Sequence, residues 1–107
     1  MPRRPFILLA LLLIPFSLHA ELSAERQREL IHLLKHDCGS CHGMTLQGGL
    51  GSALTPEALA SRPAELMVST ILDGRPGTPM PPWRSMLTRE EVEWLVDKLY
   101  EGDTNVP

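Results

Sequence analysis

Aromatic residues are scarce in this sequence, at 5% of 107 positions, and it contains only two cysteines, which close one disulfide at most. So short a chain forms one small domain, which excludes a multidomain enzyme with its own substrate domain. Acidic residues outnumber basic ones, 13 to 10, for a net charge of −3. This balance argues against nucleic acid or an anionic membrane surface as the main partner. With so little to pack, the chain must draw stability from another source.

Strand-like alternation and internal repeats are also missing, so we predict an all-α fold. The 10 prolines and 8 glycines indicate short helices joined by shaped loops. Helix boundaries are marked by Ser23 as a cap, by Gly74 as a stop, and by a capping box of Thr88 and Glu91. We expect helices over residues 24 to about 36, 63–72 and 89–100.

Apolar residues recur at helical spacing in each of these segments, so each helix is expected to have one buried side. In the first helix, His32 and His36 fall on the face opposite the leucines. The expected inward residues are Leu30, Leu33 and Leu34 of the first helix, Leu66, Met67, Thr70 and Ile71 of the second, and Val92, Leu95, Val96 and Leu99 of the third.

Two segments are unsuited to regular structure. Residues 39–51 hold five glycines and no helical periodicity, which predicts a loop that passes close to something. Residues 76–82 hold four prolines in seven positions, and proline lacks the backbone donor that helices and strands use. The second segment is therefore expected to be a stiff, extended loop.

The N-terminus has the pattern of a secretory signal. Two arginines precede an apolar run over residues 6–14, and Ala20 offers a small residue for cleavage. The run has nine residues, against the roughly 20 that span a bilayer. We expect residues 1–20 to be removed after export, leaving residues 21–107 as an acidic domain without stable membrane insertion. Retention as an uncleaved signal anchor is the alternative.

The residues Cys38-Gly39-Ser40-Cys41-His42 form a C-x-x-C-H motif, the attachment pattern of c-type haem. Two thiols three positions apart reach the two vinyl groups of one porphyrin, and the next residue lies under the iron, where its imidazole binds. The motif predicts one haem c per chain, attached through Cys38 and Cys41, with His42 as the proximal ligand. Haem would also act as a core for so small a chain.

Three other functions of the cysteine pair fit the sequence less well. A thioredoxin-like C-x-x-C needs a βαβ pattern, and the sequence has no strand pattern. A structural zinc site needs four ligands, and the nearby His32 and His36 lie on the far face of their helix. A disulfide between Cys38 and Cys41 leaves His42 and the glycine-rich loop unexplained.

Met80 is the favoured sixth ligand of the iron. It lies in the proline-rich segment, where prolines would fix the direction of the thioether before the metal arrives. Met44 is too close to the proximal side to cross the ring, and Met67 sits on a helix stripe where core packing is expected. The remaining candidates are Met86, the second choice, and His32 and His36.

A thioether ligand in place of a second imidazole favours reduced iron and raises the potential. With both axial positions filled, no general base and no substrate pocket, such an iron exchanges electrons but hardly catalyses. We therefore predict a carrier of single electrons rather than an enzyme. If Met80 does not bind, an open iron acting as a gas sensor or weak peroxidase is the alternative.

The chain resembles a class I monohaem cytochrome c over nearly all residues after the signal, which implies three main helices around one haem. In that family a Gly-Pro-x-Leu step provides a proline carbonyl that receives the proximal imidazole N–H. Here the step is Gly51-Ser52-Ala53-Leu54, so the Ser52 carbonyl is expected to orient His42 on a less rigid backbone. Trp94 resembles the aromatic at the crossing of the first and last helices, although periodicity places it beside the haem or toward solvent.

More narrowly, residues 36–43, 46–54 and 71–83 resemble the small cytochromes of the NirC type. This implies a periplasmic electron carrier of denitrification that donates to the nitrite reductase with c-type and d-type haem. A factor for maturation of that reductase's d-type haem is the implied alternative. Arg75 and Arg84 flank the proline-rich loop, where they would meet an acidic redox partner or haem propionates; ordinary solvated arginines are equally compatible.

Overall fold

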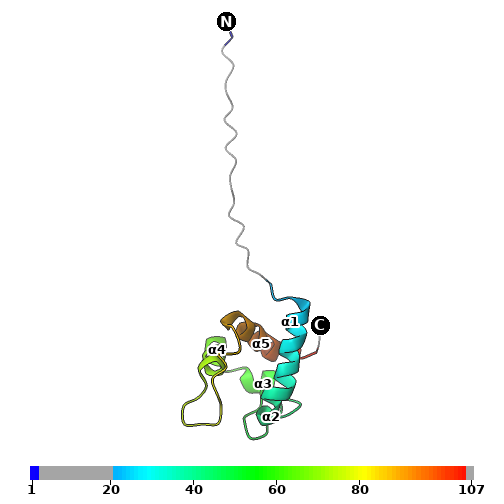
Figure 1. Ribbon diagram of the computed structural model, residues 1–107, viewed down its shortest axis with the longest axis vertical. Helices are drawn as coiled ribbons and strands as arrows, with labels where there is room; N and C mark the ends of the chain where they lie inside the picture. The colour runs from blue at the N-terminus through cyan, green and yellow to red at the C-terminus, as the bar shows by residue number, and fades with distance from the viewer. Residues whose placement is uncertain (3–20, 106–107) are drawn as a thin grey trace.

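The computed structural model describes residues 1–2 and 21–105 of the chain, and the predicted secretory signal with its cleavage point falls outside these described residues. Every regular element in the described part is helical (Figure 1), which confirms the all-α prediction. Within the same residues, no helix combines the length and apolar character that a membrane span requires.

The first helical stretch is longer than predicted. Helix α1 spans Ala24–Leu33, with the Ser23 hydroxyl accepting from the Arg26 amide at 3.1 Å as its cap. It continues without a break into a π-helical turn, η1 (Leu34–Cys38), and a short helix, α2 (Gly39–His42). The predicted start of the loop at Gly39 was therefore wrong. Gly39 is buried within the helix, and the loop begins at Gly43.

Two helices follow the glycine-rich loop. Helix α3 (Pro56–Leu59) is capped by the Thr55 hydroxyl, and α4 (Ala64–Asp73) ends before Gly74, within one residue of the predicted limits. The predicted buried side of α4 was wrong at Leu66, which is 53% exposed, whereas Met67, Val68 and Leu72 are buried. Helix α4 is apolar on more than one side, so its sequence pattern fits two different buried faces. Packing against α5 determines which of these faces is buried.

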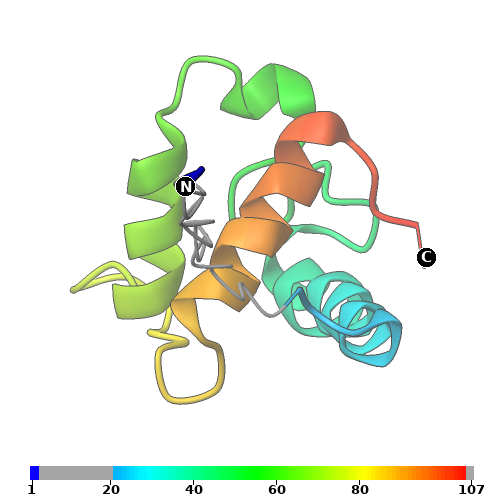
Figure 2. The same ribbon diagram turned by 90° about the horizontal axis from the view of Figure 1, so that it is seen from above.

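Helix α5 (Arg89–Glu101) is the centre of the molecule. It contacts α1, α3 and α4, and Figure 2 shows it lying between α4 on one side and α1 on the other. Both halves of the predicted capping box are present, and Gly102 ends the helix. Burial of one leucine or valine contributes roughly 1.5–3 kcal/mol. The buried apolar residues are Leu30, Ile31, Leu34, Leu46, Leu59, Met67, Val68, Leu72, Leu87, Val92, Leu95, Val96 and Leu99.

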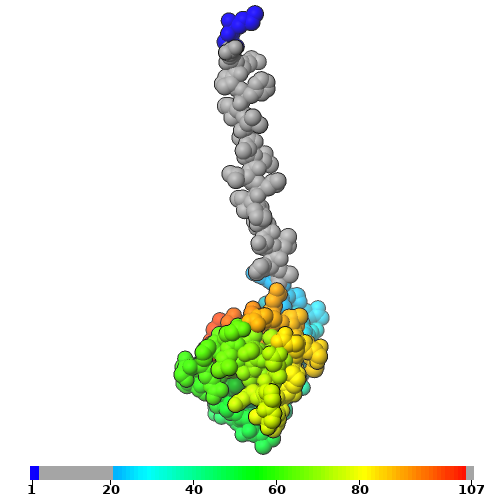
Figure 3. Space-filling view, turned by 90° about the vertical axis from the view of Figure 1, so that its left-hand side faces the viewer, coloured from blue at the N-terminus to red at the C-terminus, as the bar shows by residue number. Residues whose placement is uncertain are grey.

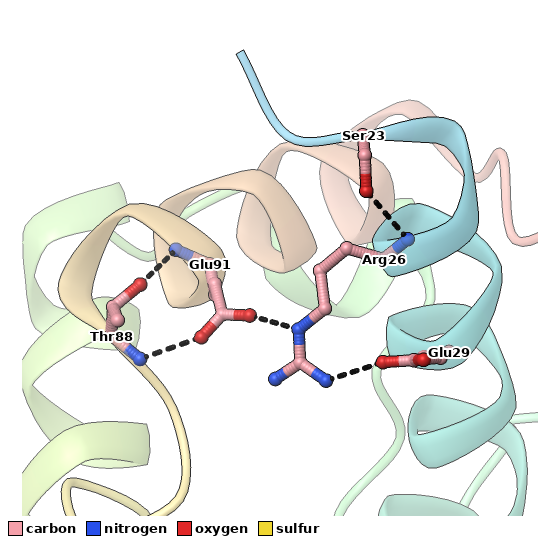
Figure 4. A network of polar contacts seen from close by, with 5 residues as sticks. All are labelled: Ser23, Arg26, Glu29, Thr88 and Glu91. Carbon is pink, nitrogen blue, oxygen red and sulfur yellow. Dashed lines mark hydrogen bonds and ion pairs between the residues drawn. The ribbon is translucent and has the colours of Figure 1, made fainter. Parts of the chain in front are cut away.

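A polar network joins the starts of α1 and α5 (Figure 4). The Arg26 guanidinium donates to the Glu91 carboxylate across 65 residues of sequence, and at 2.8 Å to Glu29. The other Glu91 oxygen accepts from the Thr88 amide at 2.9 Å. Hydrogen bonding from Arg26 is the main reason that the pKa of Glu91 lies below its usual value. The capping carboxylate of α5 thus also fixes α1.

Candidate functional site

The two cysteines lie at the end of the first helical stretch, where η1 gives way to α2. Cys38 is half-buried and Cys41 is exposed, and neither forms a disulfide. Burial, together with the nearby charge of Asp37, raises the pKa of the Cys38 thiol to about 11. The disulfide alternative is therefore not what the structure forms, and both sulfur atoms remain available for thioether bonds.

His42 follows Cys41 directly and is held by the backbone of the next loop. Its Nδ1 lies 2.7 Å from the carbonyl oxygen of Ser52. Because a carbonyl only accepts, Nδ1 carries the proton, and Nε2 keeps its lone pair for a metal. The expectation that the Ser52 carbonyl orients His42 is confirmed.

The glycine-rich loop wraps around this imidazole, as its composition predicted. The Gly48 amide donates to the His42 carbonyl at 2.8 Å, and the Gly51 amide donates to the Cys41 carbonyl at 2.7 Å. A Cβ at Gly51 would lie 2.8 Å from the His42 ring, closer than real Cβ contacts allow. The missing side chain therefore leaves room for the ring, and the two amides lock the loop onto the motif.

The loop that carries Met80 returns to the end of α4. The Trp83 amide donates to the Ile71 carbonyl at 3.0 Å, and the Arg84 amide donates to the Leu72 carbonyl at 3.1 Å. These bonds satisfy carbonyls that the last turn of a helix leaves open. The Arg75 amide donates to the Met80 carbonyl at 3.2 Å, which closes the loop around the half-buried Met80.

Thr78, in the same loop, was not predicted from the sequence to have a role. The Thr78 hydroxyl donates to the Arg75 carbonyl at 2.7 Å and accepts from the Met80 amide at 3.4 Å. These two hydrogen bonds stabilise the loop next to the candidate ligand. The available sequence feature was a threonine two residues before Met80, a position typical of hydroxyl-stabilised turns.

The α1–α2 stretch and the loop after α4, which carry the two candidate ligands, belong to different sides of the molecule. Figure 2 shows α4 and its loop on one side of α5 and the α1–α2 stretch on the other, while Figure 1 shows both loops extending toward the same end. Figure 3 shows the face where α4 and the loop after it, coloured green to yellow, gather.

The other methionines are placed less suitably. Met67 is buried in the core, as its stripe position predicted, whereas Met44 and Met86 are 61% and 63% exposed. Met44 packs near Gly39, beside the cysteine motif. Of the thioethers in the described residues, Met80 is the one held half-buried in a loop closed by hydrogen bonds.

The two arginines beside the loop differ in their surroundings. Arg84 forms an ion pair with Asp73 at 2.7 Å, and both side chains are more than half exposed, so the pair adds little stability. Arg75 is exposed and makes no ion pair within the described residues. Arg75 is therefore the freer of the two for an external partner.

Trp94 lies at the margin of the core. Its ring is half-buried against the core residues, and the Lys98 ammonium lies 5.3 Å from the ring centre. Trp94 is therefore neither buried in the core nor fully directed toward solvent, and a position beside the haem stays a prediction. Tyr100, the next-to-last residue of α5, donates its hydroxyl hydrogen to the Arg62 carbonyl and so ties α5 to the segment before α4.

Comparison with known proteins gives concordant similarities. Residues 25–97 match the family described as cytochrome C oxidase, cbb3-type, subunit III. A cytochrome c55X of Pseudomonas aeruginosa is 60% identical over 75% of this chain and 67% of its own length. A solved structure of a c-type cytochrome NirC superposes with a TM-score of 0.76 at 57% identity, covering 80% of this chain and all of that one.

A larger protein contains a similar segment. The dihydro-heme d1 dehydrogenase of Pseudomonas aeruginosa is 36% identical over 70% of this chain, which corresponds to 15% of that enzyme's length. The similarity therefore concerns one part of the dehydrogenase and not its whole structure.

Proposed function

This chain belongs to the cytochrome c55X family of small NirC-like monohaem cytochromes, and we propose that it carries single electrons in the periplasm, to the dissimilatory nitrite reductase of denitrification. Membership already places it among the c-type cytochromes associated with the nitrite reductase system. The proposal adds the direction of electron flow, the ligands of the iron and the cellular compartment.

The donor groups of the site fit haem c. Two unpaired thiols stand three positions apart, and the next side chain is an imidazole with its Nδ1 already bonded to protein. We assign one haem to the chain, attached through Cys38 and Cys41. When bound, haem c supplies a one-electron iron couple.

The observation that carries the proposal is the 2.7 Å hydrogen bond from His42 to the Ser52 carbonyl. It fixes the tautomer and the ring orientation, and it leaves Nε2 as the proximal ligand. Met80 is assigned as the distal ligand, because its loop is closed by the Arg75 amide and braced by Thr78. With both His42 and Met80 bound to the iron, no coordination position would be left for a substrate, which would favour electron transfer over substrate binding.

The absorption spectrum of the holoprotein tests this assignment. Bound Met80 gives a low-spin spectrum with a weak near-infrared charge-transfer band in the oxidised form. The variant Met80→Ala should lose that band and bind carbon monoxide when reduced, while Met86→Ala, the matched control on an exposed methionine, should keep the parent spectrum. A high-spin parent protein that binds carbon monoxide would instead support the sensor or peroxidase alternative.

A second function is favoured by one specific observation, the similarity to a segment of the dihydro-heme d1 dehydrogenase. A dehydrogenase must pass its electrons on, and a cytochrome resembling one of its own parts is suited to accept them. In this alternative the chain serves maturation of d-type haem rather than turnover of nitrite.

A deletion strain distinguishes the two functions. Reductase that is isolated without its full d-type haem would support maturation. Reductase with full haem content but slower nitrite turnover in cell extracts, restored by adding the purified cytochrome, would support electron donation.

Export is proposed from residues 1–20, which match a secretory signal, with residues 21–107 as the haem-binding domain. Mass spectrometry of the holoprotein from a periplasmic extract should give a chain that starts at Glu21. A full-length chain in the membrane fraction would show the signal-anchor alternative.

A further inference from the structure

We propose that His32 and His36 form a surface site for a divalent transition-metal ion such as Cu²⁺ or Zn²⁺, independent of the haem motif. The two histidines lie four residues apart on one helical stretch, and both are exposed. Their ring centres are 4.1 Å apart, with ring planes inclined by 43°. Metal–nitrogen bonds of about 2.0–2.1 Å require two donor nitrogens only a few ångströms apart, which this spacing allows.

The π-helical turn explains why the rings lie so close. His32 is in the last turn of α1 and His36 is in η1, where the Gly39 amide bonds to Leu34, five residues back. In an α-helix, four residues overshoot a full turn by about 40°. The wider π turn reduces this offset, which agrees with ring centres only 4.1 Å apart.

The ring nitrogens are not engaged elsewhere. Neither histidine makes a hydrogen bond or an ion pair in the part of the chain that the structure describes. The buried side of the same stretch carries Leu30, Ile31 and Leu34, so the histidines point away from the core. They are thus available to an ion from solvent without disturbing the packing.

The donor set selects the class of metal. Imidazole nitrogen suits Cu²⁺, Ni²⁺ and Zn²⁺, with Cu²⁺ bound most tightly, whereas Mg²⁺ and Ca²⁺ prefer oxygen. Within residues 1–2 and 21–105, no group of three or more His, Cys, Asp or Glu side chains is arranged around a metal position. The chain therefore provides two ligands, and water completes the shell.

Charged neighbours leave the site close to neutral. Glu29 and Arg28 precede His32, and Lys35 and Asp37 flank His36. The Glu29 carboxylate already bonds to Arg26 at 2.8 Å, so it is not a ready third ligand. Affinity rests on the chelate of two imidazoles, which makes each histidine necessary.

Titration calorimetry of the untagged mature holoprotein with zinc chloride tests the site. We expect one Zn²⁺ per chain, and at least tenfold weaker binding in His32→Asn and in His36→Asn, since even outer-shell changes weaken metal sites by about 10–100-fold. Asp37→Asn, an exposed neighbour with a carboxylate, is the control and should bind like the parent. An unchanged haem spectrum in every variant shows that the fold and the iron ligands are intact.

A second measurement keeps the test decisive. Zinc binding to the folded state should raise the unfolding temperature of the parent and of Asp37→Asn, but not of the double variant His32→Asn/His36→Asn. Binding that survives in the double variant, that depends on only one histidine, or that shows half an ion per chain would overturn the two-imidazole site.

Discussion

A Cβ atom placed on Gly74 would lie 2.8 Å from the carbonyl oxygen of Met80, and equally close to backbone atoms of Pro81 and Pro82. Gly74 also has a φ of +69°, in the region that favours glycine. The end of α4 and the return of the loop therefore fit together only because this residue has no side chain. The position of the candidate ligand Met80 depends on a residue six positions earlier.

The variant Gly74→Ala should displace the loop. A strained backbone costs about 1–3 kcal/mol, and the contact with the Met80 carbonyl adds to it. We expect a lower free energy of unfolding and loss or weakening of the near-infrared band that reports Met80 ligation.

Gly77→Ala provides the control for this effect. Gly77 has a similar φ of +76°, but a Cβ there would meet no atom within 4 Å. It should lose stability through backbone strain alone and keep the Met80 band. Equal spectral damage in both variants would show that the close packing at Gly74 is not what positions the ligand.

On the proximal side, Gly51→Ala should disturb His42. The new methyl would lie 2.8 Å from ring atoms of the imidazole, so the ring or the loop must move and the 2.7 Å bond to Ser52 must lengthen. We expect a changed reduction potential, measured by spectroscopic redox titration. The yield of low-spin holoprotein, measured from the absorption spectrum, should fall. Gly39→Ala, whose added Cβ has its nearest contact at 3.5 Å, should match the parent.

The link between Arg26 and Glu91 predicts how stability depends on pH. The pKa of Glu91 is lowered in the folded state, chiefly by the hydrogen bond from Arg26, so its contribution is fully present above the unfolded pKa of about 4.3. The contribution is lost as the pH falls through the folded pKa. Glu91→Gln should therefore lower the free energy of unfolding by about 1–3 kcal/mol at pH 7, and the deficit should shrink as the pH is lowered past 4.

Denaturant unfolding of the parent and Glu91→Gln between pH 7 and pH 3 measures this deficit, and the difference between the two proteins cancels the titration of shared groups. Glu29→Gln, which removes only the exposed partner of Arg26, should have a much smaller effect. A constant deficit across the pH range would contradict the assigned role of the carboxylate.

The surroundings of the two loop arginines predict different effects on docking, provided that the chain is an electron carrier. Arg75→Glu should slow electron transfer to an acidic partner at low salt, and the difference should vanish at high salt. Arg84→Glu should have a smaller docking effect, since Arg84 is already paired with Asp73. Stopped-flow rates as a function of ionic strength measure both, and equal rates for all three proteins would remove Arg75 from the docking face.

Much of this architecture was predictable because short-range chemistry sets it. The caps at Ser23 and Thr88 and the stop at Gly74 depend on neighbouring residues, and the structure has them where the sequence indicated. The spacing of the cysteines and histidine could likewise be recognised, because it is the attachment pattern of c-type haem.

Other features depend on contacts that sequence does not display. Gly39 reads as a helix breaker, yet it is buried in α2, where the backbone of Met44 comes within 3.5 Å of a Cβ position. Leu66 fits a helical stripe as well as Val68 does, and only the position of α5 decides between them. The brace at Thr78 requires the loop to be folded before the hydroxyl has partners.

The wide turn at Leu34–Cys38 has a consequence for how the molecule tolerates change. Each residue of an α-helix advances the side chains by about 100°, so one additional residue in a turn shifts the angular phase of everything after it. The apolar stripe that packs on α5 and the cysteine motif thus lie at different angular positions around one continuous helical stretch. Deleting a single residue from this turn would rotate Cys38 and His42 about the helix axis by about 100°. The core residues before the turn would keep their positions.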